Sequence, residues 1–162
     1  MKASVSIVLC TYNGAKYLSE QLDSILAQTY PLHEIIIQDD NSTDETVNII
    51  HEYACKYSFI KFFENNSAHG VNGNFISAMQ RATGDYIAIS DQDDIWEADK
   101  IENQMNSIGK NLLCSGFSRP FSTDGSFAYF DHRKRNVNVV RMCFLGLPGH
   151  TLLLRRELIN ML

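Results

Sequence analysis

The feature that most constrains the fold of this chain is a repeated alternation of short apolar runs and helix-like segments. The apolar runs cover residues 5–10, 34–38, 59–63 and 86–90. They contain mostly β-branched, aliphatic and aromatic side chains and are followed by polar or turn-forming residues, which is typical of buried strands. Strands that alternate with helices of about 10 to 15 residues predict βαβ units. We therefore expect an α/β, Rossmann-like domain with a mainly parallel sheet and helices on both faces.

The segments between these runs carry apolar side chains at the three- and four-residue spacing of one helical face. The expected inward positions are Leu18, Leu22, Ile25 and Leu26; Val47, Ile50, Ala54 and Tyr57; Phe75, Ala78, Met79 and Ala82; and Ile101, Met105 and Ile108. Ser42 followed by Glu45 is a capping-box pattern that predicts the start of the second helix. Gly84 and Gly109 fit the stops of the third and fourth helices.

The helical pattern fades after residue 110. Further strands are expected at residues 112–118, 127–130 and 137–145, so this part should be antiparallel or mixed. Residues 151–154 are again apolar, and the charged segment 155–157 that follows is able to open a helix. A length of 162 residues with 44% hydrophobic residues predicts one domain, residues 1–162.

Charge and cysteine usage narrow the class of protein. The net charge of −5 argues against nucleic acid as the main partner, since phosphate binding needs clustered basic residues, and the run 133–135 is interpreted as a solvated loop. No run approaches the roughly 18 apolar residues of a membrane span, and no secretory signal opens the chain. The four cysteines show no metal-binding spacing. We expect a cytoplasmic protein without a transmembrane segment.

Polar clusters follow three of the expected strands, at residues 11–13, 39–42 and 91–94. Ligands of open parallel sheets bind at the carboxyl ends of the strands, so these clusters should meet at one edge. Several carboxylates together are costly unless a cation joins them. Asp91 and Asp93 suit Mg²⁺ or Mn²⁺, which takes a few carboxylates and completes its shell with water and substrate phosphates. The sequence therefore predicts a divalent-metal site for a phosphate compound.

Other side chains at this edge allow more than one interpretation. For Asp39 and Asp44, a role in the turn and at the helix N-terminus is favoured over ligand binding. Tyr12 is either an ordinary core aromatic or, because it sits between polar residues at the start of a loop, a ring that stacks on a base. Trp96 is either a structural plug behind the aspartates or a platform for substrate, and His150 is a weaker ligand candidate.

Three segments together carry a resemblance to a known family: residues 6–14, 38–46 and 84–96. In order and spacing they resemble the family 2 glycosyltransferases, inverting enzymes of the GT-A fold that use nucleotide sugars. The resemblance covers about the first two thirds of the chain, and three ordered motifs are more specific than any one. Residues 90–96 are most similar to bacterial members that build surface polysaccharides, including rhamnosyltransferase-like ones. Asn41 replaces a glycine of many members, and Asn accepts left-handed geometry.

The resemblance implies roles for individual residues. It places the nucleotide sugar at Thr11, Tyr12, Asn13, Asp40, Asn74 and Asp91. In this assignment Thr11 and Tyr12 pack on the base and ribose, and Asp40 contacts the base. Asp91 and Asp93 form the DxD motif, which holds the Mg²⁺ or Mn²⁺, with Asp93 in direct contact and Asp91 nearer the ribose or sugar.

The implied reaction is transfer of a sugar, with inversion, from a nucleotide-diphosphate donor to a saccharide or lipid-linked acceptor in cell-surface polysaccharide synthesis. The resemblance also allows the full-length protein to contact a membrane peripherally. Residues 1–109 are then the nucleotide-sugar-binding part, and residues 110–162 begin an acceptor-side part that is incomplete. Inversion needs a general base. We expect this base beyond Leu162, with an unidentified residue of this chain as the alternative. Asp124, Asp131 and Glu157 are conceivable, but no motif selects any of them, so the catalytic residue is unknown.

Two other classes remain open at this point. A metal-dependent phosphohydrolase also places Asp-x-Asp at a strand end, but its nucleophilic aspartate normally follows the first strand, where this chain has Thr11 to Asn13. Phosphate release from simple phosphomonoesters would favour it. The third class is a catalytically inactive fragment that binds a nucleotide sugar and transfers nothing.

Overall fold

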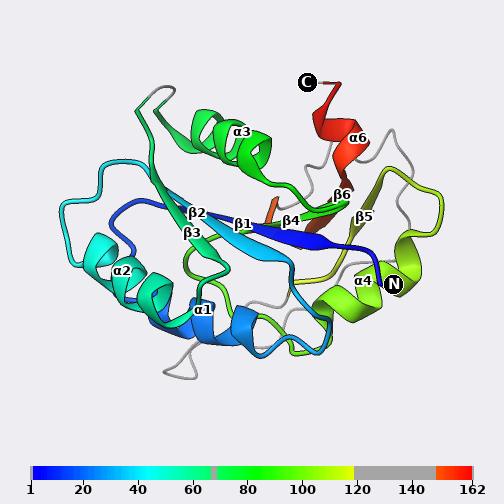
Figure 1. The fold of residues 1–162 in the computed structure, drawn as a ribbon, viewed down its shortest axis with the longest axis horizontal. Helices are drawn as coiled ribbons and strands as arrows, with labels where there is room; N and C mark the ends of the chain where they lie inside the picture. Colours follow the sequence, from blue (N-terminus) through cyan, green and yellow to red (C-terminus); the bar gives the residue numbers. More distant parts are fainter. Residues whose placement is uncertain (1, 67–68, 119–148, 162) are drawn as a thin grey trace.

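A computed structural model describes residues 2–66, 69–118 and 149–161, in which strands and helices alternate (Figure 1). The strands are β1 (Val5–Thr11), β2 (Glu34–Asp39), β3 (Ile60–Glu64), β4 (Tyr86–Ser90), β5 (Leu113–Ser115) and β6 (Leu152–Arg155). The helices are α1 (Leu18–Leu26), α2 (Thr46–Lys56), α3 (Val71–Arg81), α4 (Lys100–Ile108) and α6 (Arg156–Ile159), and a short 3-10 turn, η1 (Gly149–Thr151), precedes β6.

The six strands form one sheet in the order β3-β2-β1-β4-β6-β5. The first four strands are parallel, and β6 runs antiparallel to both β4 and β5. Thr11 pairs with Asp39 and Leu9 pairs with Ser90, so β1, β2 and β4 end close together. This register brings the three polar segments that follow these strands to one edge of the sheet.

Burial explains why the strands lack the alternation of a half-exposed sheet. All residues of β1, β2 and β4 are buried, as expected for parallel strands covered on both faces. Successive side chains point to opposite faces: Ile7 packs in the core cluster that includes Leu22 and Ile101, whereas Val8 packs with Ala78. Figure 1 shows α1, α2 and α4 on one face and α3 and α6 on the other. The predicted doubly covered α/β fold is confirmed.

Two predicted helix boundaries are wrong. The helix α2 begins at Thr46 and not at Ser42, because the Ser42 hydroxyl donates to Asp39 Oδ1 at 2.5 Å instead of capping a helix. Asp44 accepts the backbone N–H of Thr46 at 3.0 Å, in line with the role at the helix start that the sequence favoured. The helix α3 ends at Arg81, before an extended Ala82, so Gly84 does not stop it.

The carboxyl-terminal part joins the same sheet. Strand β5 lies within the predicted run 112–118, and β6 and α6 follow as the sequence indicated, which confirms the mixed character of this part. The strands expected at residues 127–130 and 137–145 lie outside the described residues, as does the basic run 133–135. None of the described helices combines the length and apolar character that a membrane span requires.

Candidate functional site

A cavity of about 360 Å³ lies at the carboxyl ends of β1, β2 and β4. Its walls are Cys10, Thr11, Tyr12, Asp40, Gly70, Val71, Asn74, Phe75, Asp91, Gln92 and Asp93. Six of the residues singled out from the sequence, from four separate segments of the chain, therefore share one pocket. Asn13 is not among the lining residues. The volume is within the range of small-molecule sites.

The loop after β1 presents one aromatic ring. Thr11 is buried and donates its hydroxyl to Asp39 Oδ1 at 2.6 Å, so this side chain and that carboxylate are used inside the protein. Asn13 has a left-handed backbone, with φ of 48°, and its Oδ1 accepts the N–H of Thr43 at 2.8 Å. Tyr12, between them, is 59% exposed. Thr11 and Asn13 shape the loop, and the Tyr12 ring is available to a ligand.

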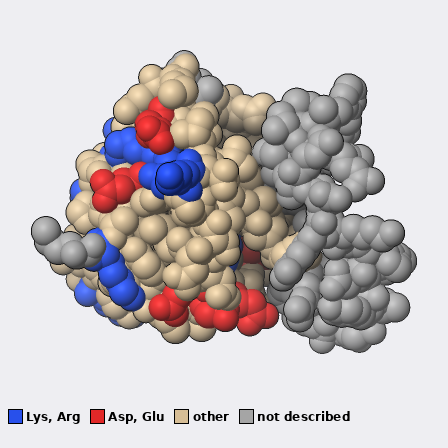
Figure 2. All heavy atoms as spheres, turned by 90° about the vertical axis from the view of Figure 1, so that its right-hand side faces the viewer, with Lys and Arg blue, Asp and Glu red and all other residues tan. Residues whose placement is uncertain are grey.

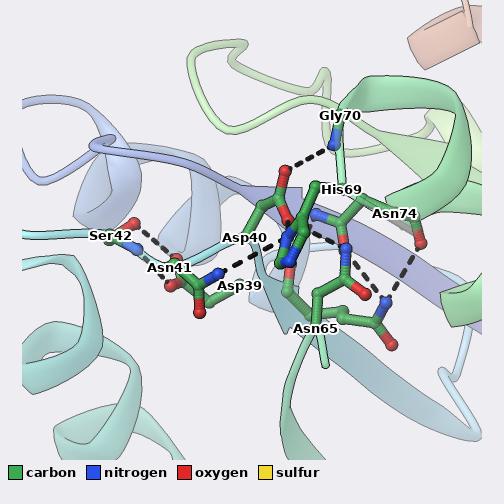
Figure 3. Close-up of polar contacts among 9 residues, drawn as sticks. Asp39, Asp40, Asn41, Ser42, Asn65, His69, Gly70 and Asn74 are labelled. Atoms are coloured by element: carbon green, nitrogen blue, oxygen red, sulfur yellow. Dashed lines mark hydrogen bonds and ion pairs between the residues drawn. The ribbon is translucent and has the colours of Figure 1, made fainter. Parts of the chain in front are cut away.

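Asp40 is another carboxylate that lines the pocket, and three donors converge on it (Figure 3). It accepts hydrogen bonds from Asn65 Nδ2 at 2.9 Å, His69 Nδ1 at 2.8 Å and the Gly70 backbone N–H at 2.7 Å. Burial alone would raise the pKa of Asp40, but these hydrogen bonds outweigh it and lower the pKa. The carboxylate is thus ionised and oriented. Asn41, beside it, has φ of 64°, the left-handed geometry expected there.

Asn74 forms part of the wall, but its amide is engaged. It is only 2% exposed; its Oδ1 accepts from Gln38 Nε2 at 2.9 Å, and its Nδ2 donates to the Gln38 carbonyl at 3.2 Å (Figure 3). Arg81 Nε donates to the other end of the Gln38 amide at 3.0 Å. Asn74 therefore joins α3 to β2 and supports the pocket. Sequence reasoning missed Gln38 as its partner, because strand pairing and helix docking create the contact.

The aspartates after β4 meet a histidine from the far end of the chain. His150, in η1, has Nδ1 3.1 Å from Asp91 Oδ2 and 3.4 Å from Asp94 Oδ2. Ligand atoms of these three residues lie within 4.8 Å of one another, a spacing that suits a metal ion. The hydrogen bond to Asp91 raises the pKa of His150, and burial raises the pKa of Asp94. Asp93 is not a member of this group; it is exposed and lines the pocket.

Trp96 and Lys100 lie behind this group. Trp96 is 5% exposed and packs in the core, so it is the structural plug rather than the platform. Lys100 Nζ lies 3.3 Å from the centre of the Trp96 ring and donates to the His150 carbonyl at 2.7 Å. Burial lowers the pKa of Lys100 to about 7. Lys100 is the first residue of an amphipathic helix, where a lysine is usually a solvent-exposed residue. The sequence therefore did not indicate that Lys100 contacts His150 and Trp96.

Cys10 also lines the pocket, but it is a poor nucleophile. Burial raises the pKa of its thiol strongly, and the carboxylates of Asp91 and Asp40 add to the effect. Because the thiolate is the reactive form, Cys10 acts as a small apolar wall residue.

Of the three conceivable bases, Glu157 is described, and it lies away from the pocket. It lines a separate hollow with Asp85, Arg155, Arg156 and Asn160, at the end of the sheet where β4 begins. Figure 2 views the molecule from that side and shows basic and acidic side chains next to one another. Glu157 is thus at the wrong end of β4 to act in the pocket. Asp124 and Asp131 lie outside the described residues.

A mainly parallel sheet with helices on both faces, and polar loops that meet at the carboxyl ends of its strands, defines the class of open α/β proteins, whose ligands bind at that edge. Comparison with known proteins narrows this class. The family model described as Glycosyl transferase family 2 matches residues 6–160, and the chain belongs to this family.

Relatives and solved structures agree. The Escherichia coli enzyme UDP-Glc:alpha-D-GlcNAc-diphosphoundecaprenol beta-1,3-glucosyltransferase WfaP is 42% identical over 114 residues, which are 70% of this chain and 45% of WfaP. The mannosyltransferase PcManGT of Pyrobaculum calidifontis, solved with GDP-Man and Mn²⁺, has the same fold, with a TM-score of 0.76 and 24% identity over 99% of this chain and 47% of that one. TarS of S. aureus, solved with UDP, also has this fold. Its TM-score is 0.71 and its sequence identity is 22%, and the match covers 98% of this chain and 48% of the TarS chain. The chain spans about half the length of the curated relatives it matches.

Proposed function

We propose that this chain is the donor-binding part of an inverting glycosyltransferase that moves a sugar from a nucleotide-diphosphate sugar to a saccharide or lipid-linked acceptor in cell-surface polysaccharide biosynthesis. The observation that carries the proposal is the shared pocket: Tyr12, Asp40, Asp91 and Asp93 come from three loops and line one cavity. Membership of the family supports it. The names of relatives such as WfaP, whose donor is UDP-Glc and whose acceptor is lipid-linked, support the substrate class.

In this proposal the base lies between the Tyr12 ring and the Asp40 carboxylate. The exposed ring offers a stacking surface, and Asp40 offers an ionised acceptor for an N–H of the base. The ribose and sugar then lie toward Asp91. The diphosphate lies beside Asp93, the exposed carboxylate of the pocket.

A divalent metal, Mg²⁺ or Mn²⁺, belongs to the proposal because an acidic pocket would otherwise repel a diphosphate. The residues present fit such a metal ion, because ligand atoms of Asp91, Asp94 and His150 lie within 4.8 Å of one another. In addition, Asp94 Oδ2 and His150 Nε2 are buried atoms that have no hydrogen-bond partner among the described residues. We assign the metal to Asp93 and Asp91. His150, which is hydrogen-bonded to Asp91, would orient that carboxylate, and Asp94 is a further carboxylate within reach of the ion. The bound metal would neutralise charge on the departing diphosphate.

The transfer step needs a base on the face of the sugar opposite the diphosphate. We assign no residue of this chain to that role, and we propose that the rest of the acceptor-side part, which residues 110–162 begin, supplies it. The boundary that we propose at residue 109, between a donor-binding part and an acceptor-side part, separates two functions and not two structural domains. Strands β5 and β6, which follow this boundary, belong to the same sheet as the strands that we assign to donor binding. We also propose a cytoplasmic location, which the unpaired Cys10, Cys55 and Cys114 support, because cysteines typically stay reduced there. Cell fractionation tests it.

The first experiment is a calorimetric titration with UDP, dTDP and GDP, each with and without Mn²⁺ or Mg²⁺. We expect one diphosphate to bind, and only with metal, which would also identify the nucleotide. Absence of binding to all three would contradict the proposed site. Release of phosphate from simple phosphomonoesters would instead favour a phosphohydrolase.

A second measurement separates transfer from binding alone. The sugar donor that matches the bound nucleotide is incubated with the chain, and hydrolysis and transfer are followed. Donor binding with neither reaction would identify this chain as an inactive nucleotide-sugar-binding fragment, an outcome that its length relative to its relatives makes worth testing.

A further inference from the structure

Gln92, the middle residue of the Asp91-x-Asp93 motif, does not point into solvent. Its Oε1 accepts the backbone N–H of Tyr12 at 2.8 Å, and its Nε2 donates to the Tyr12 carbonyl at 3.0 Å. One side-chain amide thus satisfies both backbone groups of a residue 80 positions away, as a neighbouring strand would. This pairing joins the loop after β4 to the loop after β1 at the point where the regular sheet has ended.

Gly14 makes room for this amide. A Cβ at Gly14 would lie 2.2 Å from Gln92 Oε1 and 2.5 Å from Gln92 Cδ, and the three nearest heavy atoms all belong to Gln92. Gly14 does not have a positive φ, so its lack of a side chain serves this close approach and not an unusual backbone. An alanine at position 14 would therefore be compatible with the backbone but would push the Gln92 amide away.

The same loop is held on its other side by residues that follow β2. Asn13 N donates to Ser42 Oγ at 2.8 Å, and Gly14 N donates to Thr46 Oγ1 at 2.8 Å. Residues 13 and 14 are thus fixed from the β2 side, whereas the backbone of Tyr12 is fixed by Gln92 from the β4 side. The Tyr12 ring is mostly exposed and lines the pocket, so its position depends on how the backbone of Tyr12 is held.

We propose that Gln92 is a positioning residue for donor recognition: it fixes the backbone of Tyr12 so that the ring is held ready for the base, and Gly14 is required for this contact. The inference rests on the proposed donor site but assigns a residue and a partner to it that the motif resemblance does not. Asp91 is held separately by His150, so loss of the Gln92 amide should weaken recognition of the base and spare the metal and diphosphate.

The contact itself is tested without any ligand, by hydrogen exchange of the Tyr12 amide in NMR. Gln92→Met keeps the length of the side chain and removes both hydrogen bonds, so the Tyr12 amide should exchange at least about ten-fold faster. Gly14→Ala should give the same increase. In a Gln92→Ala background, adding Gly14→Ala should have no further effect, because the atom it displaces is gone; additive effects or an unchanged exchange rate would overturn the contact.

Gln28→Met is the matched control. Gln28 also bonds to backbone, donating to the Glu97 carbonyl at 2.8 Å and accepting the Ile101 N–H at 3.0 Å, but it does not line the pocket. The Gln28→Met variant should have a lower melting temperature than the wild type, but the hydrogen-exchange rate of its Tyr12 amide should be unchanged. If both variants accelerate exchange at Tyr12 equally, the effect is general destabilisation and the proposal is wrong.

The role in recognition is tested by two ligands: the diphosphate among UDP, dTDP and GDP that the wild type binds, and inorganic pyrophosphate with Mn²⁺. Gln92→Met should weaken the nucleotide about ten-fold, within the range that stacking of one base contributes, and leave pyrophosphate within about two-fold. Equal losses for both ligands would mean a disturbed metal loop and would overturn the proposal. If the wild type binds neither nucleotide nor pyrophosphate, the proposed function fails, whereas the exchange experiment still decides whether Gln92 holds Tyr12.

Discussion

The imidazole Nδ1 of His150 lies 3.1 Å from the Asp91 carboxylate, although the two residues are 59 positions apart. Strand β6, which pairs antiparallel with β4, places η1 beside the end of β4 and so makes this contact. Outer partners of this kind orient metal-binding carboxylates. The segment that leads into β6 therefore places a residue, His150, beside the proposed donor site, and the Asp91-x-Asp93 motif itself does not contain that residue.

His150→Ala should weaken Mn²⁺ binding by roughly 10–100-fold, the range found for partners that orient metal ligands. Calorimetric titration with Mn²⁺ measures the change, and His51→Ala, an exposed histidine on α2, is the control. Complete loss of metal binding would instead make His150 a direct ligand, in the group with Asp91 and Asp94. Unchanged affinity would contradict both roles.

Asp93→Ala should abolish metal-dependent binding of the nucleoside diphosphate, because it removes the exposed carboxylate that lines the pocket. Asp99→Ala provides the control: Asp99 is exposed at the start of α4 and makes no capping hydrogen bond with its side chain. Calorimetry with the diphosphate and Mn²⁺ is the measurement. An Asp93→Ala protein with wild-type affinity would disprove the assignment.

Glu34 makes stability depend on acid pH. It is 1% exposed and accepts hydrogen bonds from Ser6 Oγ, Thr83 N and Oγ1, and Lys61 Nζ. Burial alone would raise the pKa of Glu34, but the bonds from Lys61, Thr83 and Ser6 lower it from 4.5 to about 2. Between these values the unfolded chain binds more protons, so the free energy of unfolding falls as pH drops from about 4.5 toward 2.

Glu34→Gln should remove the contribution of Glu34 to this pH dependence, and so make the fall in the free energy of unfolding shallower, while Asp40, Asp44 and Asp85, whose pKa values are also lowered, keep theirs. It should also cost about 2 kcal/mol at neutral pH, because Lys61 and the neighbouring donors lose a charged acceptor. Urea unfolding at several pH values measures both effects. Glu52→Gln, at an exposed position of α2, should change neither. A variant that keeps the wild-type slope between pH 4.5 and 2 would rule out Glu34 as its source.

Gly84→Ala should destabilise the protein by about 1–3 kcal/mol, the cost of inserting a methyl group into closely packed structure. A Cβ there would lie 2.8 Å from the backbone N of Ser6 and 3.1 Å from the Ser4 carbonyl, neither of which can rotate away. At Gly116 the nearest atom is 3.5 Å from the added Cβ, an ordinary contact, so Gly116→Ala should have little effect. Similar melting temperatures for the two variants would contradict this view of Gly84.

The fold could be predicted from the sequence to a large extent, because hydrophobic periodicity is a local property. The apolar runs at 5–10 and 86–90 became central strands, and the helical spacing of Leu18 to Leu26 became α1. The predicted helix boundaries were wrong where a residue that resembled a local helix signal instead makes a contact with a distant part of the chain. The pattern Ser42-x-x-Glu45 resembled a helix cap, but the Ser42 hydroxyl bonds to Asp39, which β2 brings within reach. Gly84 resembled a helix stop, but it permits β1 to approach.

What the sequence alone determined is which side chains reach the ligand-binding edge of the sheet, since residues after parallel strands must gather there. Only the tertiary structure decided which of them are free to act. Strand register joins Asp39 to Thr11 and so removes it from the pocket, helix docking engages the Asn74 amide with Gln38, and the antiparallel β6 delivers His150 to Asp91. Each of these contacts joins residues far apart in the chain, and their geometry is set by the packing of the whole sheet.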